Sequence, residues 1–194
     1  MNAGAVNPVK KEVSIHIGEC HVSREPTVIR TLLGSCVAVC LFDPVTQVGG
    51  MNHILLPGQA DLAHYDAPTR YALNAMDLLI TNIMKLGGNR HHLTAKVFGG
   101  GNIIPSISEE FGMGQKNIAF VLEFLRVENI RITGQDLGGF DSRRIYFHTD
   151  SGDVFLKRIV NSNLRLAKTE EKYIKQVRKQ GFPTGEVELF SPKI

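Results

Sequence analysis

The sequence predicts an α/β or α+β fold, in which a mixed sheet or a two-layer β-sheet core is flanked by helices. Three observations favour this class. Expected strands and helices follow one another along the chain. Residues 37–42 are apolar at odd and even positions alike, and residues 68–86 show the period of an amphipathic helix. A chain of 194 residues, 43% of them hydrophobic, can also bury a core without a metal or a disulfide.

The first half of the chain contains three expected strands. Val13–Ile17 alternates apolar and polar residues, the pattern of a strand with one buried face. Val37–Phe42 is apolar throughout, which is typical of a strand buried on both faces. Asp43-Pro44 then favours a type I turn, so we expect Val48–Leu56 to return as an antiparallel partner.

The strongest helix signal lies between Pro68 and Leu86. Pro68 fits the first helical position and Gly87-Gly88 follows the last turn, so both ends carry residues that are typical there. We expect a second helix over Gln115–Glu128. The apolar face of the first helix consists of Ala72, Ala75, Met76, Leu79, Ile80, Ile83 and Leu86.

The remaining expected strands lie on either side of the second helix. Thr94–Phe98 precedes it and ends at a tight glycine-rich turn, Gly99–Asn102, which lacks the Lys-Ser/Thr pair of a Walker phosphate loop. A hairpin turn at Asp150–Gly152 joins the last two strands. The strands that follow the second helix are expected over Ile130–Gln135, Arg144–Thr149 and Asp153–Val160.

A basic segment follows this domain, which we place at residues 12–162. Between residues 164 and 180, six Lys or Arg residues outnumber two Glu residues. Tyr173 is the one aromatic residue there, and a nucleic-acid platform needs stacked rings as well as positive charge, so no nucleic acid is expected as a partner. We expect residues 163–194 to form a basic, partly helical tail, docked through Leu166, Ile174 and Val177.

The cysteine count and the apolar runs indicate the compartment. Three cysteines, an odd and sparse set, exclude a secreted disulfide framework and favour a reducing environment. The longest apolar run, Val37–Phe42, is far shorter than the roughly 20 residues that span a bilayer. Residues 1–12 lack the apolar core of a signal peptide. We therefore expect a cytoplasmic protein that is not membrane-embedded.

Cys36 and His53 form the candidate catalytic pair. If Asp43–Thr46 is the hairpin connection, Phe42 pairs with Gln47 and Cys36 lies opposite His53, with Cβ atoms about 4.5–5.5 Å apart. Gly34-Ser35 before the cysteine leaves room for a substrate and for backbone amides aimed at it. A thiolate, a base and oxyanion donors together favour a cysteine hydrolase acting on an acyl or amide carbon.

The other cysteines and the histidines favour plainer interpretations. Cys40 lies mid-strand and Cys20 has no partner at metal-ligand spacing, so both are expected to pack as small hydrophobic residues. No ligand set is formed with cysteine or aspartate by His64, His91, His92 and His148. Neither a metal nor a cofactor is therefore expected.

A series of motifs runs in order through residues 12–160: Thr31–Cys40, Gly50–Pro57, Phe98–Asn102, Gly114–Asn117 and Asp136–Gly139. This series resembles the CheD family of chemoreceptor glutamine deamidases. The resemblance implies a CheD-like cysteine hydrolase fold that converts selected glutamines of methyl-accepting chemotaxis receptors to glutamate, with release of ammonia and without a cofactor. The family's Cys-His-Thr triad falls on Cys36 as nucleophile, His53 as general base and acid, and Thr31 as the residue that orients the imidazole.

The resemblance also implies partners: the receptors themselves and a CheC-type phosphatase, with which similar proteins pair. Two other functions are open on the residues alone. One is a non-enzymatic adaptor that binds receptors or the phosphatase, and the other is a thiol hydrolase that acts on peptides or acyl groups. Thiol reactivity at Cys36 separates an enzyme from an adaptor, and product analysis separates the two enzymes.

Overall fold

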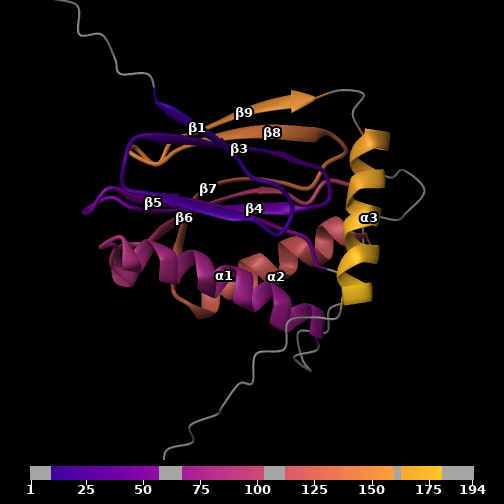
Figure 1. Ribbon diagram of the computed structural model, residues 1–194, viewed down its shortest axis with the longest axis horizontal. Coiled ribbons are helices and arrows are strands. Elements are labelled where there is room, and N and C mark those ends of the chain that lie inside the picture. Colours follow the sequence, from indigo (N-terminus) through magenta and orange to yellow (C-terminus); the bar gives the residue numbers. More distant parts are fainter. Residues whose placement is uncertain (1–9, 57–66, 103–111, 160–162, 181–194) are drawn as a thin grey trace, which may run out of the picture.

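The protein stacks two β-sheets and covers one of them with two helices, as Figure 1 shows. The computed structural model describes residues 10–56, 67–102, 112–159 and 163–180. Within them the five-stranded sheet has the order β2-β5-β4-β6-β7, and the four-stranded sheet the order β1-β3-β8-β9. The two-layer form of the predicted fold class is confirmed.

The elements have the following bounds. The five-stranded sheet contains β2 (Cys20–Ser23), β5 (Val48–Ile54), β4 (Val37–Asp43), β6 (Thr94–Gly99) and β7 (Arg131–Leu137). The four-stranded sheet contains β1 (Lys11–Ser14), β3 (Thr27–Leu33), β8 (Ser142–His148) and β9 (Val154–Ile159). The helices are α1 (Ala67–Lys85), the 3₁₀ turn η1 (Arg90–His92), α2 (Met113–Val127) and α3 (Asn163–Gln180).

Most predicted elements are confirmed to within two residues, and two strands were missed. The prediction for the first strand, Val13–Ile17, was displaced, because β1 ends at Ser14. The missed strands are β2 and β3, and in β3 the exposed Arg30 interrupts the apolar pattern. Of the positions named above, Pro57, His64, Val160 and residues 181–194 lie outside the described residues.

β4 is the central strand of the molecule and is buried on both faces, as predicted. Val37, Val39 and Leu41 point to α1 and α2 and belong to one apolar cluster. Ala38 and Cys40 point to the four-stranded sheet and belong to a second cluster. Burying one such side chain contributes roughly 1.5–3 kcal/mol.

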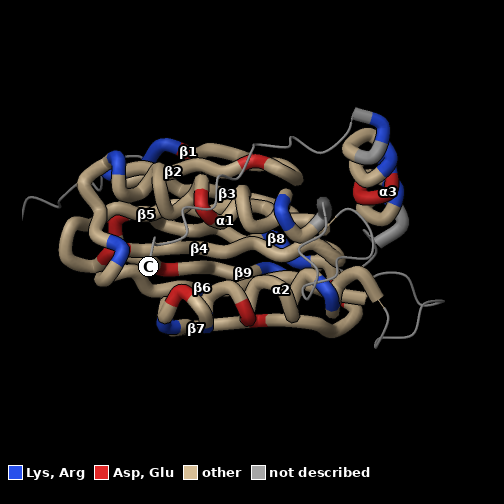
Figure 2. Tube along the Cα trace, turned by 90° about the horizontal axis from the view of Figure 1, so that it is seen from below, with Lys and Arg blue, Asp and Glu red and all other residues tan. Residues whose placement is uncertain are grey.

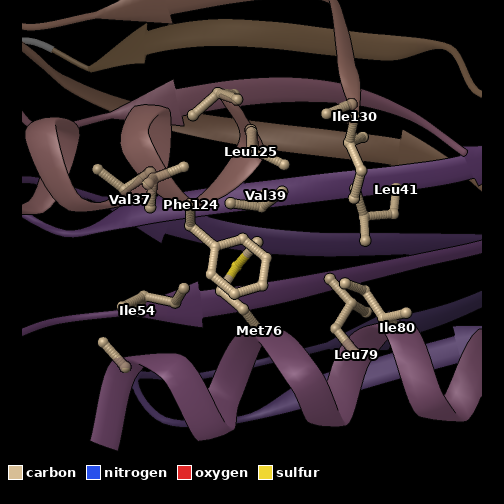
Figure 3. Close-up of a cluster of buried hydrophobic side chains, with 14 of the residues drawn as sticks. Val37, Val39, Leu41, Ile54, Met76, Leu79, Ile80, Phe124, Leu125 and Ile130 are labelled. Carbon is tan, nitrogen blue, oxygen red and sulfur yellow. The ribbon is translucent and has the colours of Figure 1, made fainter. Parts of the chain in front are cut away.

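The cluster beneath α1 and α2 is the larger of the two. Figure 3 shows Met76, Leu79 and Ile80 of α1 facing Val39 of β4 and Phe124 of α2. Met76 and Leu79 are fully buried. The helical period that predicted α1 therefore predicted its packing face as well.

The predicted register between β4 and β5 was wrong by two residues. Asp43 already pairs with Val48 and Ala38 pairs with His53, so the loop is Pro44–Gln47 rather than Asp43–Thr46. Gln47 belongs to the loop because its φ of 55° lies in the left-handed region. A shift of two residues leaves every side chain on its face. His53 therefore stays on the Cys36 face, two residues from the position directly opposite Cys36.

The third helix, α3, stands across the ends of both sheets (Figure 1). Its partly buried Tyr173 and Ile174 pack against the cluster between the sheets. Figure 2 shows Lys and Arg residues gathered along this helix. One side of α3 thus meets the protein, and exposed basic residues lie along its outside, together with Glu171.

Candidate active site

The turn that carries Cys36 is held by main-chain hydrogen bonds from the glycine-rich turn after β6. Gly100 N–H donates to Cys36 O at 2.7 Å and Gly101 N–H donates to Gly34 O at 2.7 Å. Gly99 has a φ of +116°, and a Cβ atom there would lie 2.1 Å from Cys36 O. Only glycine fits so close to this carbonyl group. The Gly99–Asn102 motif therefore positions the backbone around the candidate nucleophile.

Asn117 of α2 fixes the same turn from another side. Its buried side chain donates from Nδ2 to Ser35 O at 2.8 Å and accepts at Oδ1 from Leu56 N–H at 2.8 Å. One amide thus connects the residue before Cys36 to the segment that follows β5. Since β5 carries His53, Asn117 sets the spacing between the two candidate catalytic segments.

The Asp136–Gly139 motif supports the glycine-rich turn in the same way. Gly138 N–H donates to Gly99 O at 2.9 Å, and Asn102 N–H donates to Gly139 O at 2.7 Å. The fully buried Arg143 guanidinium donates to Asp136 and to Gly138 O. Motifs far apart in the sequence therefore form one scaffold under Cys36.

His53 is held by Thr31 in one orientation and one tautomer. The Thr31 hydroxyl donates its single hydrogen to Ile15 O at 2.8 Å. Towards His53 Nδ1, which lies 2.8 Å from Thr31 Oγ1, the hydroxyl can therefore only accept, so Nδ1 carries the imidazole proton. Nε2 is left as an acceptor. It is buried and has no hydrogen-bond partner among the described residues.

The imidazole is neutral because it is buried. His53 is 4% exposed, and burial together with the nearby charge of His16 lowers its pKa to about 3. The ring therefore has the unprotonated Nε2 that a general base requires, while the burial that keeps it unprotonated also lowers its basicity.

One cavity brings the three predicted site residues together. Thr31, Cys36 and His53 all line a cavity of about 710 Å³ between the body of the protein and α3. This volume lies within the range of small-molecule and side-chain binding sites. The Cys36 side chain is itself almost fully buried, with 1% exposure.

Glu170 of α3 is the polar residue at this site that sequence reasoning missed. Its carboxylate accepts hydrogen bonds from Ser35 N–H at 3.0 Å, from Ser35 Oγ at 2.5 Å and from Cys36 Sγ at 3.2 Å. It is 5% exposed. A signal existed, because Glu170 lies four residues from both Leu166 and Ile174 and so on the apolar face of the helix.

The contact between Glu170 and Cys36 shifts both pKa values. Burial, and then the Glu170 carboxylate, raise the pKa of the Cys36 thiol well above its ordinary value. Burial also raises the pKa of Glu170, against the lowering effect of the hydrogen bonds from Ser35 and Cys36. With α3 in this position, the site favours a thiol over a thiolate.

The other two cysteines lie in apolar or partly exposed packing positions. Cys40 is buried against Met51 in the cluster between the sheets, and burial raises its thiol pKa. Cys20 begins β2 and is partly buried, with Asn82 Nδ2 at 3.9 Å from its sulfur. Both serve as packing residues, as predicted.

Two kinds of feature are absent from the described residues. In the part of the chain that the structure describes, no three His, Cys, Asp or Glu side chains are grouped so as to hold a metal ion. Within the same residue ranges, no helix is both long enough and apolar enough to cross a membrane.

Comparison with known proteins bears on the motifs that build this site. A family model described as "CheD chemotactic sensory transduction" matches residues 55–158, just over half of the chain. A protein of Janthinobacterium sp. (strain Marseille), named "Probable chemoreceptor glutamine deamidase CheD", is 42% identical over 179 residues, which cover 90% of this chain and 86% of that protein. The chain belongs to the CheD family.

Two further CheD proteins extend the likeness across the site. One from Chromobacterium violaceum is 40% identical over 92% of this chain and 89% of its own length. One from Shewanella oneidensis is 41% identical over 93% of this chain and 88% of its own length. The family model begins at Leu55, but matches that cover more than nine-tenths of the chain are too long to leave out residues 31–53.

Proposed function

We propose that this protein deamidates glutamine side chains of chemoreceptors to glutamate. In this reaction Cys36 is the nucleophile, His53 is the general base and acid, and Thr31 is the positioning residue that orients the imidazole. Membership of the CheD family and the names of its relatives support the receptor as substrate. The residues in the cavity support the chemistry.

The arrangement of Thr31 and His53 is the observation that carries this proposal. Thr31 fixes the proton on Nδ1, so the free Nε2 remains in a cavity that the Cys36 side chain also lines. A buried polar atom without a hydrogen-bond partner lowers the stability of the fold, so its presence indicates a functional role. The Cys36 thiol, which lines the same cavity, is the proton donor for which this nitrogen would act as the base.

The reaction proceeds in two balanced steps. The Cys36 thiol gives its proton to His53 Nε2, and the sulfur forms a bond to the side-chain amide carbon of glutamine. The carbon–nitrogen bond then breaks, and ammonia leaves with the proton that His53 returns. In the second step His53 takes a proton from water, the hydroxide cleaves the thioester, and the glutamate carboxylate and free thiol are restored.

Main-chain N–H groups at the turn before β4 supply oxyanion donors. Ser35 N–H already binds one carboxylate oxygen, that of Glu170, at 3.0 Å. The glycine-rich turn and Asn117 hold this backbone in place, so little reorganisation is needed as negative charge develops on the substrate oxygen.

The test is to incubate the full chain with a receptor cytoplasmic fragment. Mass spectrometry of the fragment would show glutamines converted to glutamate, with matching ammonia release. Cys36→Ala should lower the rate by at least about 10³-fold, because no other group can form the thioester. Cys40→Ala is the matched control and should keep the activity, since Cys40 is as buried as Cys36 and lies four residues further along, in β4.

Each rival function has its own outcome in this experiment. Binding of the fragment with no ammonia release from any variant would indicate an adaptor. Cleavage of peptides or acyl esters without glutamine conversion would indicate a thiol hydrolase of another specificity. Equal ammonia release by the parent chain and Cys36→Ala would reject the nucleophile.

The family resemblance supports two further proposals. A CheC-type phosphatase is a second binding partner, and the cytoplasm, where receptor signalling domains lie, is the place of action. Size-exclusion chromatography of this chain with such a phosphatase should give a complex. Two unshifted peaks at micromolar concentrations would reject this partner.

A further inference from the structure

Glu170 stands in relation to Cys36 as a reaction product would. Deamidation turns a glutamine side chain into a glutamate side chain, and the residue found at the nucleophile is a glutamate. One of its carboxylate oxygens, Oε1, lies 3.2 Å from Cys36 Sγ and 3.0 Å from Ser35 N. The Ser35 N–H that would bind the substrate carbonyl oxygen and the thiol that would attack the substrate carbon therefore both contact Glu170.

The side chain of Glu170 is delivered by a helix that lies over the cavity. Leu166 and Ile174, one turn before and one turn after it, are partly buried, as is Tyr173. These residues form one face of α3, with Glu170 at its centre. A glutamine presented from another helix could reach the thiol by the same route only after α3 had moved away.

The contact between α3 and the protein is incompletely packed. A cavity of about 710 Å³ lies between them, lined on the α3 side by polar residues that include Thr169, Lys172 and Gln176. Protein interiors are close-packed, with few voids larger than a water molecule, whereas this cavity is open to solvent. The α3 contact therefore resembles a separable interface rather than part of the core.

The docked position of α3 also opposes the chemistry. The Glu170 carboxylate occupies the Ser35 N–H donor, and its negative charge next to Cys36 Sγ disfavours the thiolate. A residue that assisted the nucleophile would have the opposite effect.

We propose that α3 is an internal product analogue that closes the active site, with Glu170 in the subsite that receives the substrate glutamine side chain. This inference rests on the proposed function. The substrate is then a glutamine carried on a helix, and it competes with α3 for one groove. The apparent Kd for substrate equals the intrinsic Kd divided by the fraction of molecules in which α3 is undocked.

The first experiment measures the reactivity of Cys36 in the full chain. Iodoacetamide labelling of each cysteine is followed by peptide mass spectrometry for the parent chain, Glu170→Ala and Glu171→Gln. We expect Cys36 to react at least about tenfold faster in Glu170→Ala, since one hydrogen bond to a charged group is worth about that factor. Glu171 is exposed and paired with Lys175, so Glu171→Gln should leave the rate unchanged.

Cys40 is the internal reference for this measurement. It is as buried as Cys36 and lies in β4, the strand that begins directly after Cys36, so general loosening of the fold would accelerate the labelling of both cysteines. Faster labelling of Cys36 alone supports local opening at α3. Equal Cys36 rates in the parent chain and Glu170→Ala would overturn the closed-site proposal, whatever the enzyme activity proves to be.

The second measurement shows whether Glu170 occupies the substrate subsite or acts on Cys36 only through its negative charge. If Glu170 competes with substrate, Glu170→Ala should lower KM for a receptor fragment about tenfold or more and leave kcat nearly unchanged. A change in kcat with a constant KM would show that Glu170 acts through its charge alone, which would overturn the competition.

The decisive experiment turns Glu170 into a substrate. In Glu170→Gln the side chain at the nucleophile is a glutamine, and Cys36 should convert it to glutamate with release of ammonia into solution. Intact-mass and peptide analysis of freshly purified protein would show this conversion at position 170. The double variant Cys36→Ala with Glu170→Gln should keep its glutamine.

The outcomes distinguish the two proposals. Conversion at position 170 that depends on Cys36 supports the subsite assignment. A glutamine that persists at position 170 while the same sample deamidates a receptor fragment would overturn the subsite but not the function. No deamidation of either glutamine would overturn the proposed function, and the labelling rates would still decide whether Glu170 closes the site.

Discussion

The helices α1 and α3 are both amphipathic, yet they meet the protein in different ways. α1 buries a continuous apolar face, including Met76 and Leu79, against the five-stranded sheet. α3 places a carboxylate, Glu170, at the centre of its contact and leaves a cavity beside it. The first contact is typical of a permanent core and the second of an interface that can open.

Truncation of one apolar side chain in each helix should separate the two contacts most clearly. Leu79→Ala removes a fully buried side chain of α1 and should cost about 2–5 kcal/mol of unfolding free energy. Ile174→Ala removes a partly buried side chain of α3 and should cost about 1 kcal/mol or less. Urea denaturation followed by circular dichroism measures both.

Leu78 provides the control for this pair. It is the neighbour of Leu79 on α1 but is exposed, so Leu78→Ala should change stability by less than about 0.5 kcal/mol. If Ile174→Ala cost as much as Leu79→Ala, α3 would be part of the core and the distinction between the helices would fail.

The stability contributions of His53, between the sheets, and of Glu170, on α3, should change with pH in opposite directions. Burial lowers the pKa of His53 between the sheets to about 3, so below pH 6.5 the unfolded chain binds a proton that the folded chain does not. Stability is therefore lost as pH falls from 6.5 towards 3, by roughly 2 kcal/mol at pH 5. His53→Gln should remove this loss.

Glu170, on the inner face of α3, gives the reverse dependence of stability on pH. Burial raises its pKa, so the folded chain holds the proton to higher pH than the unfolded chain does. The stability that it contributes is present below its unfolded pKa and is lost as pH rises through the folded one. The plot of unfolding free energy against pH should thus become flatter between pH 4 and 7 in His53→Gln and steeper in Glu170→Ala, whose side chain Cys36 cannot convert back to glutamate. The same slope in all three proteins would contradict the assignment.

The sequence predicted the fold better than it predicted the contacts between distant segments. The apolar run at 37–42 predicted a strand buried on both faces, and β4 has that position. The register of β4 with β5 was displaced because Asp43 was placed in the loop rather than in the ladder. Cys36 and His53 still lie on the same face, because a register shift of two residues does not move a side chain to the other face of the sheet.

Two features of the site were not visible in local patterns, because they depend on segments remote in the chain. Thr31 itself was named through the family resemblance, but its strand was missed. Thr31 lies in β3, whose mixture of Arg30 and Thr31 with apolar residues hides a strand that only its pairing with β1 and β8 reveals. Glu170 is 134 positions from Cys36, and although it shares a helix face with Leu166 and Ile174, a charged side chain on a basic helix is normally exposed. Its burial depends on hydrogen-bond donors that local patterns do not contain.

A smaller effect is expected from Thr31, which tests the network between the sheets without α3. Thr31→Val keeps the side-chain shape but leaves His53 Nδ1–H without an acceptor, so the imidazole is less well oriented. We expect kcat/KM to fall by about 10- to 100-fold, since an unsatisfied buried group costs roughly 1–3 kcal/mol. Thr31→Ser retains the hydroxyl and should restore most of the activity.

A pH–rate profile shows whether Thr31 acts through His53. In Thr31→Val the basic nitrogen can become Nδ1, so the pH dependence of kcat/KM should shift, whereas a purely structural loss would lower the curve without moving it. The loss should be the same factor in the Glu170→Ala background. A Thr31→Val effect that vanished there would show that the two regions act as one unit.

The smallest effect should come from the outer face of α3. Lys175 pairs with Glu171 one turn away at 2.6 Å, and both side chains are largely exposed. Such i, i+4 pairs contribute about 0.5 kcal/mol or less and are screened by salt. Lys175→Ala should therefore change neither stability nor the iodoacetamide labelling rate of Cys36 measurably. If Lys175→Ala opened the site as Glu170→Ala does, α3 would be held by its own helical stability or by its charge rather than by the carboxylate at Cys36. The contrast with α1 would then lie in the strength of the helix instead of in the chemistry of its contact.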